Sequence, residues 1–234
     1  MRISLPVASV LLAGVLAGCG SQSGTPSVAP VDATTSTTAS TASPATPSPA
    51  TPSVTTIPKV RAYRILTQEA LEAALLEANQ LPPGYRQNPP TPDAPAAYFC
   101  GYTPPAVEQL QVHRDFTTGT GPSAEAVRIS LRQYASADDA GLAWGALAQA
   151  LKTCTNDVIN GDKVTYAPLP APKVGEAALG VRTETGGTTV AQYFVLVGPV
   201  IMSTGGDGLV NADADTIGGI LKAQVDRYVD AAGP

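Results

Sequence analysis

The polar residues best suited to bind a ligand lie in two segments of the chain that we expect to be neighbouring strands. One segment carries His113 and Asp115, and the other carries Arg128, Arg132 and Tyr134. A guanidinium group donates paired hydrogen bonds to a carboxylate or a phosphate. If a hairpin pairs the two segments, these five side chains form a mixed polar patch that could hold an anionic group. The alternative is a solvated outer face with surface ion pairs.

The alternation of apolar and polar residues predicts where these side chains point. In the expected strand 107–116, Leu110, Val112 and Phe116 share one face, and the histidine and the aspartate lie on the other. The expected strand 126–134 alternates in the same way, with its arginines and its tyrosine opposite the apolar residues. A Gly-rich stretch at 117–123 separates the two segments and predicts a hairpin loop.

The chain offers few residues for catalysis. It has 1 His and 3 Cys, it lacks a Gly-x-Ser-x-Gly elbow, and no serine is credibly paired with the histidine. The acidic pairs Asp138-Asp139 and Asp213/Asp215 are explained by helix starts, where carboxylates interact favourably with the helix dipole. We therefore expect a protein that is not an enzyme and has neither a metal nor a cofactor.

The overall charge argues against one class of partner. Lys and Arg number 14 and Asp and Glu 19, so the formal net charge is -5. A protein that binds the phosphate backbone needs clustered positive charge. We expect no nucleic-acid partner.

The start of the chain is typical of a secreted lipoprotein. Arg2 is followed by an apolar stretch, Ile3 to Ala17, which is too short to span a bilayer and has the length of a signal-peptide core. The stretch ends in Leu16-Ala17-Gly18-Cys19, which resembles a bacterial lipobox. We expect removal of residues 1–18 and lipidation of Cys19, whose acyl chains hold the protein on the outer face of the cell membrane.

A tether follows the anchor. Residues 19–58 consist mostly of Ser, Thr, Pro and Ala, with Asp32 as the only charge. This composition cannot form a core and predicts a disordered segment, and whether it carries O-linked sugar stays open. Residues 59–234 are long enough for one folded domain.

Two cysteines remain for a disulfide. Because Cys19 is assigned to the lipid, Cys100 and Cys154 form the one pair that can be made in an oxidising compartment. We expect a structural bridge.

The pattern of expected helices and strands predicts an α+β fold for the domain. Thr67 and Ser136 are expected helix N-caps, and a last helix is expected from about Ala212 to Val229. Strands are expected at 107–116, 126–134, 181–185, 188–197 and 200–204, with Gly186-Gly187 as a tight hairpin turn. We predict an antiparallel sheet of about five to six strands, with three helices packed mainly on one face.

These features together resemble the extracellular sensor-domain family typified by the receptor kinase PknH. The resemblance covers most of residues 65–230, and the motifs that carry it, in order, are Ile65-Leu66-Thr67, Leu81-Pro82-Pro83-Gly84-Tyr85, Cys100, the helix from Trp144 to Cys154, the hairpin from Val181 to Val197 and the final helix. It implies a groove beside the sheet that binds an extracellular ligand. Family members often carry two disulfides, whereas this chain has cysteines for one. It has no kinase signature, so sensing requires a partner.

The sequence thus predicts a lipid-anchored, extracytoplasmic, non-catalytic domain of sensor type that binds a small ligand or an envelope protein. Two alternatives stay open. One is a cell-envelope hydrolase or transferase that uses carboxylates, and the other is an assembly lipoprotein that binds a membrane protein.

Overall fold

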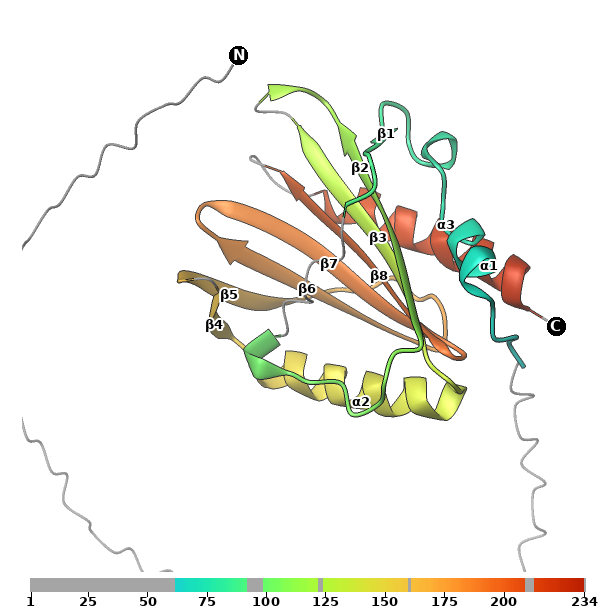
Figure 1. Ribbon diagram of the computed structural model, residues 1–234. Coiled ribbons are helices and arrows are strands. Elements are labelled where there is room, and N and C mark those ends of the chain that lie inside the picture. Colours follow the sequence, from blue (N-terminus) through green and yellow to red (C-terminus); the bar gives the residue numbers. More distant parts are fainter. Residues whose placement is uncertain (1–61, 92–98, 122–123, 160, 209–212, 234) are drawn as a thin grey trace, which may run out of the picture. The chain divides into compact units, whose positions relative to one another are not determined.

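The structure is a computed structural model that describes residues 62–91, 99–121, 124–159, 161–208 and 213–233. These residues form one antiparallel sheet of eight strands and three α-helices (Figure 1). The expected signal peptide 1–18, the lipidation site Cys19 and the tether 19–58 lie outside the described residues. None of the helices in the described part is long and apolar enough to cross a membrane.

The chain forms the three helices that we expected and more strands than we expected. In chain order they are α1 (Gln68–Ala73), the 3-10 turn η1 (Ala78–Gln80), β1 (Arg86–Gln87), the 3-10 turn η2 (Phe99–Gly101), β2 (Leu110–Thr118), β3 (Glu125–Gln133), α2 (Ala137–Thr153), β4 (Asn156–Ile159), β5 (Asp162–Leu169), β6 (Ala177–Thr185), β7 (Thr188–Val197), β8 (Val200–Gly208) and α3 (Ala214–Ala232).

The sheet is wider than the sequence indicated. Its strand order is β1-β2-β3-β8-β7-β6-β5-β4, so the hairpins β2–β3 and β6–β7 meet through β8. The prediction of five to six strands is wrong because β1, β4 and β5 were missed. The tight turn at Gly186-Gly187 is confirmed, and both glycines have positive φ angles of 54° and 86°.

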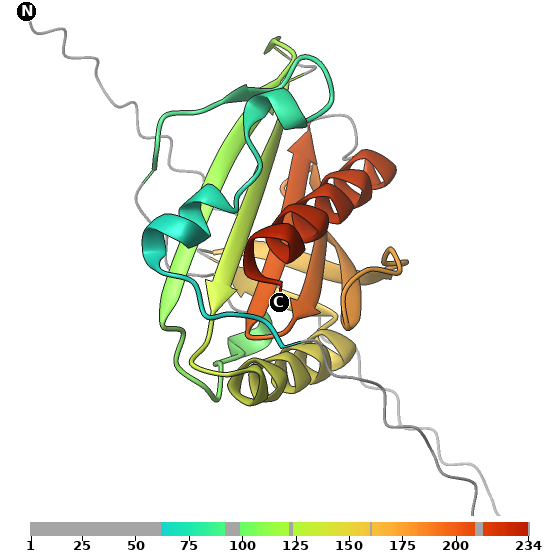
Figure 2. The ribbon, with the colours of Figure 1, turned by 90° about the vertical axis from the view of Figure 1, so that its right-hand side faces the viewer.

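The helices cover both faces of the sheet. Helices α1 and α3 pack on one face, over the core residues Phe116, Ile129 and Met202 (Figures 1 and 2). Helix α2 lies on the opposite face, where it packs with Leu196 and Ile201. The prediction that the helices pack mainly on one face is therefore correct for α1 and α3 and wrong for α2. The consequence for function is that α2 leaves part of its face of the sheet uncovered by a helix.

The helix starts predicted from the sequence are confirmed. The Thr67 hydroxyl accepts a hydrogen bond from the N–H of Ala70, and the Ser136 hydroxyl accepts one from the N–H of Asp139, at 3.3 and 3.1 Å. Helix α3 starts slightly later than expected, with Asp213 as its N-cap.

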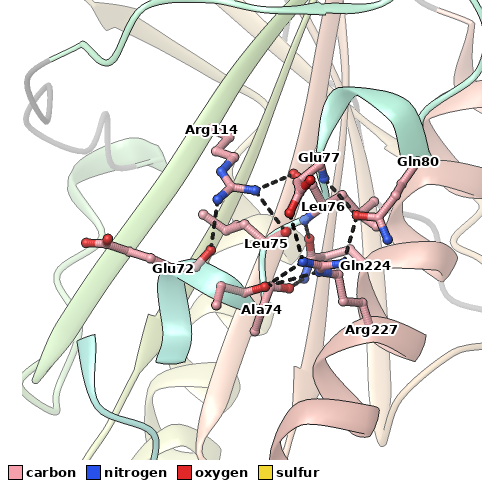
Figure 3. A network of polar contacts seen from close by, with 10 residues as sticks. Glu72, Ala74, Leu75, Leu76, Glu77, Gln80, Arg114, Gln224 and Arg227 are labelled. Carbon is pink, nitrogen blue, oxygen red and sulfur yellow. Dashed lines mark hydrogen bonds and ion pairs between the residues drawn. The ribbon is translucent and has the colours of Figure 1, made fainter. Parts of the chain in front are cut away.

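Helix α1 ends at Ala73, and side chains from the sheet and from α3 form hydrogen bonds with backbone groups at and beyond this end (Figure 3). The guanidinium of Arg114 donates to the carbonyl oxygens of Glu72, Leu75 and Leu76. Buried Gln224 donates to the carbonyl of Ala74 at 2.8 Å and accepts from the N–H of Leu76 at 2.9 Å. These bonds satisfy backbone groups that a longer helix would have paired.

Strand β8 runs through a stretch that reads as a turn in the sequence. Residues Gly205 to Gly208 pair with β3 and β7, although three glycines and one aspartate are typical of a turn. A Cβ atom at Gly206 would collide with Ile217 of α3, so the absence of a side chain lets the helix lie close to the strand.

Candidate functional site

The polar face predicted for β2 and β3 exists and lies on the side of the sheet that α2 only partly covers. In the hairpin register Asp115 is opposite Arg128, and His113 is opposite Ser130. Gln111 is opposite Arg132 in the same way. The expectation that hairpin pairing brings His113 and Asp115 near the arginines is therefore confirmed as a placement.

Asp115 and Arg128 form a bidentate ion pair. The guanidinium Nε and Nη2 lie 2.6 and 2.9 Å from the two carboxylate oxygens. The hydroxyl of Thr91 donates to the same carboxylate at 2.9 Å, and His113 Nε2 lies 3.9 Å from it. The Arg128 hydrogen bond is the main cause that holds the pKa of Asp115 below its usual range. The carboxylate is therefore ionised and committed to the arginine.

Arg132 and Tyr134 both contact a second carboxylate, that of Glu108, which we did not predict from the sequence. The Nη1 of Arg132 donates to Glu108 Oε1 at 3.0 Å, and the hydroxyl of Tyr134 lies 3.5 Å from the same oxygen. Burial, together with the charge of Glu108, raises the pKa of the Tyr134 phenol. The phenol therefore stays protonated. Each arginine of the predicted site thus has its own acidic partner.

A cavity of about 390 Å³ opens over this face. Its volume is within the range of about 300 to 1,000 Å³ that is usual for ligand pockets. The polar side chains of the sheet that line it are Gln111, Arg128, Ser130, Arg132, Thr183, Gln192 and Ser203. Rings line the cavity as well, from Phe99, Tyr102, Tyr134, Tyr166 and Phe194. The cavity therefore combines a hydrogen-bonding floor with an aromatic wall.

The disulfide predicted between Cys100 and Cys154 is present and helps to build the aromatic wall. It attaches η2 to the end of α2, with the two Cα atoms 5.8 Å apart. The neighbouring Phe99 packs edge-to-face against Tyr166 and Phe194, at centroid distances of 5.3 and 5.8 Å. The bridge therefore fixes a ring that lines the cavity.

A second hollow of about 400 Å³ adjoins the first. The two share Arg128, Val190 and Gln192 as lining residues, and Gly205 lines only the second. In the register of the sheet, Gly205 lies between Arg128 of β3 and Gln192 of β7. The polar face thus carries one groove made of two hollows that meet beside Gly205.

The described residues of the groove include no serine that is hydrogen-bonded to His113, as a hydrolase site would need. Ser130 is the cross-strand neighbour of His113, yet the serine is only 4% exposed and its hydroxyl pairs with that of Ser203 at 2.9 Å. No hydrogen bond joins Ser130 to His113 among the described residues. The described part of the chain also contains no cluster of three or more His, Cys, Asp or Glu side chains that could hold a metal ion.

Comparison with known proteins supports the fold. The domain is similar to the solved extracellular domain of PknH from Mycobacterium tuberculosis, with a TM-score of 0.53 and 14% sequence identity. The similarity covers 72% of this chain and 100% of that domain. No protein-family profile and no curated protein sequence matches the chain. At this identity the likeness establishes a common fold, and the chemistry of the groove must be argued from its own residues.

Several groove residues were not predicted from the sequence, although a hairpin signal pointed to one of the strands that carry them. Gln192 and Phe194 lie in β7, whose start and end were predicted correctly, but the apolar run of that strand concealed which residues face the groove. Tyr166 lies in β5, which was missed. The dipeptide Asn160-Gly161 before it is a strong hairpin signal and would have revealed β4 and β5.

Proposed function

We propose that this chain is a non-catalytic binding domain of the sensor type, held outside the cytoplasm by a lipid on Cys19. The observation that carries the proposal is the groove on the polar face, whose floor presents polar side chains and whose wall presents aromatic rings. Ligand sites commonly combine apolar walls with a few placed polar groups. The similarly folded PknH domain is extracellular in its own protein, which supports the proposed location.

The five residues predicted from the sequence have two different roles in this proposal. Arg128, Arg132 and Tyr134 line the groove and would contact the ligand. Asp115 lines the second hollow and would hold the Arg128 guanidinium in place, and His113 lies 3.9 Å from the Asp115 carboxylate. In this proposal a partner protein would receive the signal that ligand binding creates.

Catalysis by carboxylates has little support from the groove. Glu108 and Asp115 are each paired with an arginine, and the remaining acid of the lining, Asp207, is an exposed residue of the second hollow. General acid catalysis needs a carboxyl group that holds a proton near neutral pH, and a paired carboxylate does the opposite. Binding without chemistry is therefore the function that the arrangement supports best.

Two measurements on the chain isolated from its own membranes test the proposal. Intact mass should correspond to a chain that begins at Cys19 and carries a lipid, and a chain that retains residues 1–18 without an acyl adduct would refute the anchor. Native mass spectrometry should show a non-covalent adduct that disappears on denaturation. The binding function is refuted if the chain carries no adduct and crosslinks to no partner.

A further inference from the structure

The two hollows on the polar face indicate which chemical class the groove accepts. Resting on the proposed binding function, we infer that the groove binds a neutral, hydroxyl-rich chain such as an oligosaccharide, which crosses the sheet over Gly205. Four properties of the groove favour this class: its charge, its polar groups, its aromatic wall and the missing side chain at Gly205.

Each arginine of the groove is paired with a carboxylate of the protein, and Asp207 adds a further acidic group to the lining of the second hollow. Arg128 is paired with Asp115 at 2.6 Å, and Arg132 is paired with Glu108 at 3.0 Å. The attraction of each guanidinium for an anion is opposed by the carboxylate beside it. The groove therefore gives little net preference to a carboxylate or a phosphate, and an anionic ligand would meet both acids.

Groups that can both donate and accept hydrogen bonds lie on the floor without partners in the described part of the chain. Gln111, Thr183 and Gln192 line the first hollow, and their side chains make no hydrogen bond with any of the described residues. A hydroxyl group of a sugar also donates and accepts, so it can satisfy both ends of an amide. A carboxylate or phosphate only accepts and would leave the amide oxygens unpaired.

The aromatic wall supplies the apolar half of the same chemistry. Phe99, Tyr102, Tyr166 and Phe194 line the first hollow together with the polar floor. A sugar ring has an apolar face of C–H groups and a rim of hydroxyls, so it can contact rings on one side and amides on the other. Burial of that face against aromatic surface contributes to binding, and the rim groups set the specificity.

Gly205 lies where the two hollows meet and has no structural need to be glycine. Its φ is not among the positive values found for other glycines, and a Cβ atom added there would lie no closer than 3.5 Å, to Cγ of Gln192. Glycine inside a strand weakens it and marks places where a ligand or another backbone approaches closely. A side chain at 205 would stand between Arg128 and Gln192 and divide the groove. The ligand that needs this passage is longer than one ring.

Calorimetric titration of the full chain in detergent tests the inference. The probes are linear neutral oligosaccharides of glucose, galactose or mannose with two to four units, and the same chains bearing uronic acids or phosphates. We expect a neutral member to bind, and we expect Gly205→Val to weaken it by more than about tenfold, which is a change of about 1.4 kcal/mol. Gln192→Leu should weaken it as well.

The variants separate a blocked groove from a damaged fold. Valine favours strands, so Gly205→Val should melt no lower than the native chain. Ala167→Val is the matched control, because Ala167 is an exposed residue of β5 that lines neither hollow. Its affinity should equal that of the native chain.

Three results would overturn the inference: binding only by the charged probes, no binding by any neutral probe, or unchanged affinity in Gly205→Val. If an adduct is present on the chain from native membranes but one of these results is obtained, the binding function stands and the ligand class is wrong. If no adduct and no partner is found either, the binding function fails as well.

Discussion

Removal of the Cys100–Cys154 disulfide should destabilise the domain by an amount that can be worked out from the chain. The bridge joins residues that are 54 positions apart. In the chain-entropy treatment a closed loop of about 55 residues reduces the entropy of the unfolded state by an amount worth about 4 kcal/mol at 25 °C. For a domain of this size each kcal/mol corresponds to roughly 2 to 4 °C. The double variant Cys100→Ser/Cys154→Ser should therefore melt roughly 8 to 16 °C lower than the oxidised native domain.

Thermal unfolding followed by circular dichroism, with and without a reductant, measures this effect. Reductant should lower the melting temperature of the native chain toward that of the double variant and should leave the double variant unchanged. The reasoning is refuted if the oxidised native chain and the double variant melt together, or if thiol titration finds Cys100 and Cys154 free.

Two further outcomes follow from polar contacts, one buried and one partly exposed. Gln224→Leu removes the hydrogen bonds to the backbone of Ala74 and Leu76. Each buried group left unpaired costs about 1 to 3 kcal/mol, so urea unfolding should show that the free energy of unfolding falls by about 2 to 6 kcal/mol. The control Gln149→Leu, on the exposed face of α2, should change the free energy of unfolding little. The pKa of Asp115 is lowered in the folded state, so its stabilisation is present above the unfolded pKa of about 4 and is lost as the pH falls through the folded value. Urea unfolding between pH 6 and pH 3 should therefore show a smaller acid loss for Asp115→Asn than for the native chain, and equal losses would contradict the ion pair.

The elements that the sequence predicted best are those with local signals. The N-caps Thr67 and Ser136 are short-range features, and the turn at Gly186-Gly187 needs only two glycines. The end of α1 could not be predicted, because it depends on Arg114 and Gln224, which lie far away in the sequence. The helical spacing of Leu71, Leu75 and Ala78 favours a longer helix than the one observed, and hydrogen bonds from distant residues accompany its end at Ala73.

The candidate site was predictable only in the part that lies within one hairpin. Alternation placed Asp115 and Arg128 on one face, and hairpin pairing made them neighbours. Glu108, Gln192 and Gly205 join the site through pairings and loops that alternation does not specify. A single sequence does not reveal that β8 inserts between the two hairpins, and this insertion creates the groove.

A crystal structure of the chain isolated from its own membranes, with no ligand added, tests the central claim most directly. We expect electron density for a bound molecule over β3, β8 and β7, in contact with Gln192 and passing above Gly205. A groove without such density, or a bound molecule found only on the face covered by α1 and α3, would contradict it.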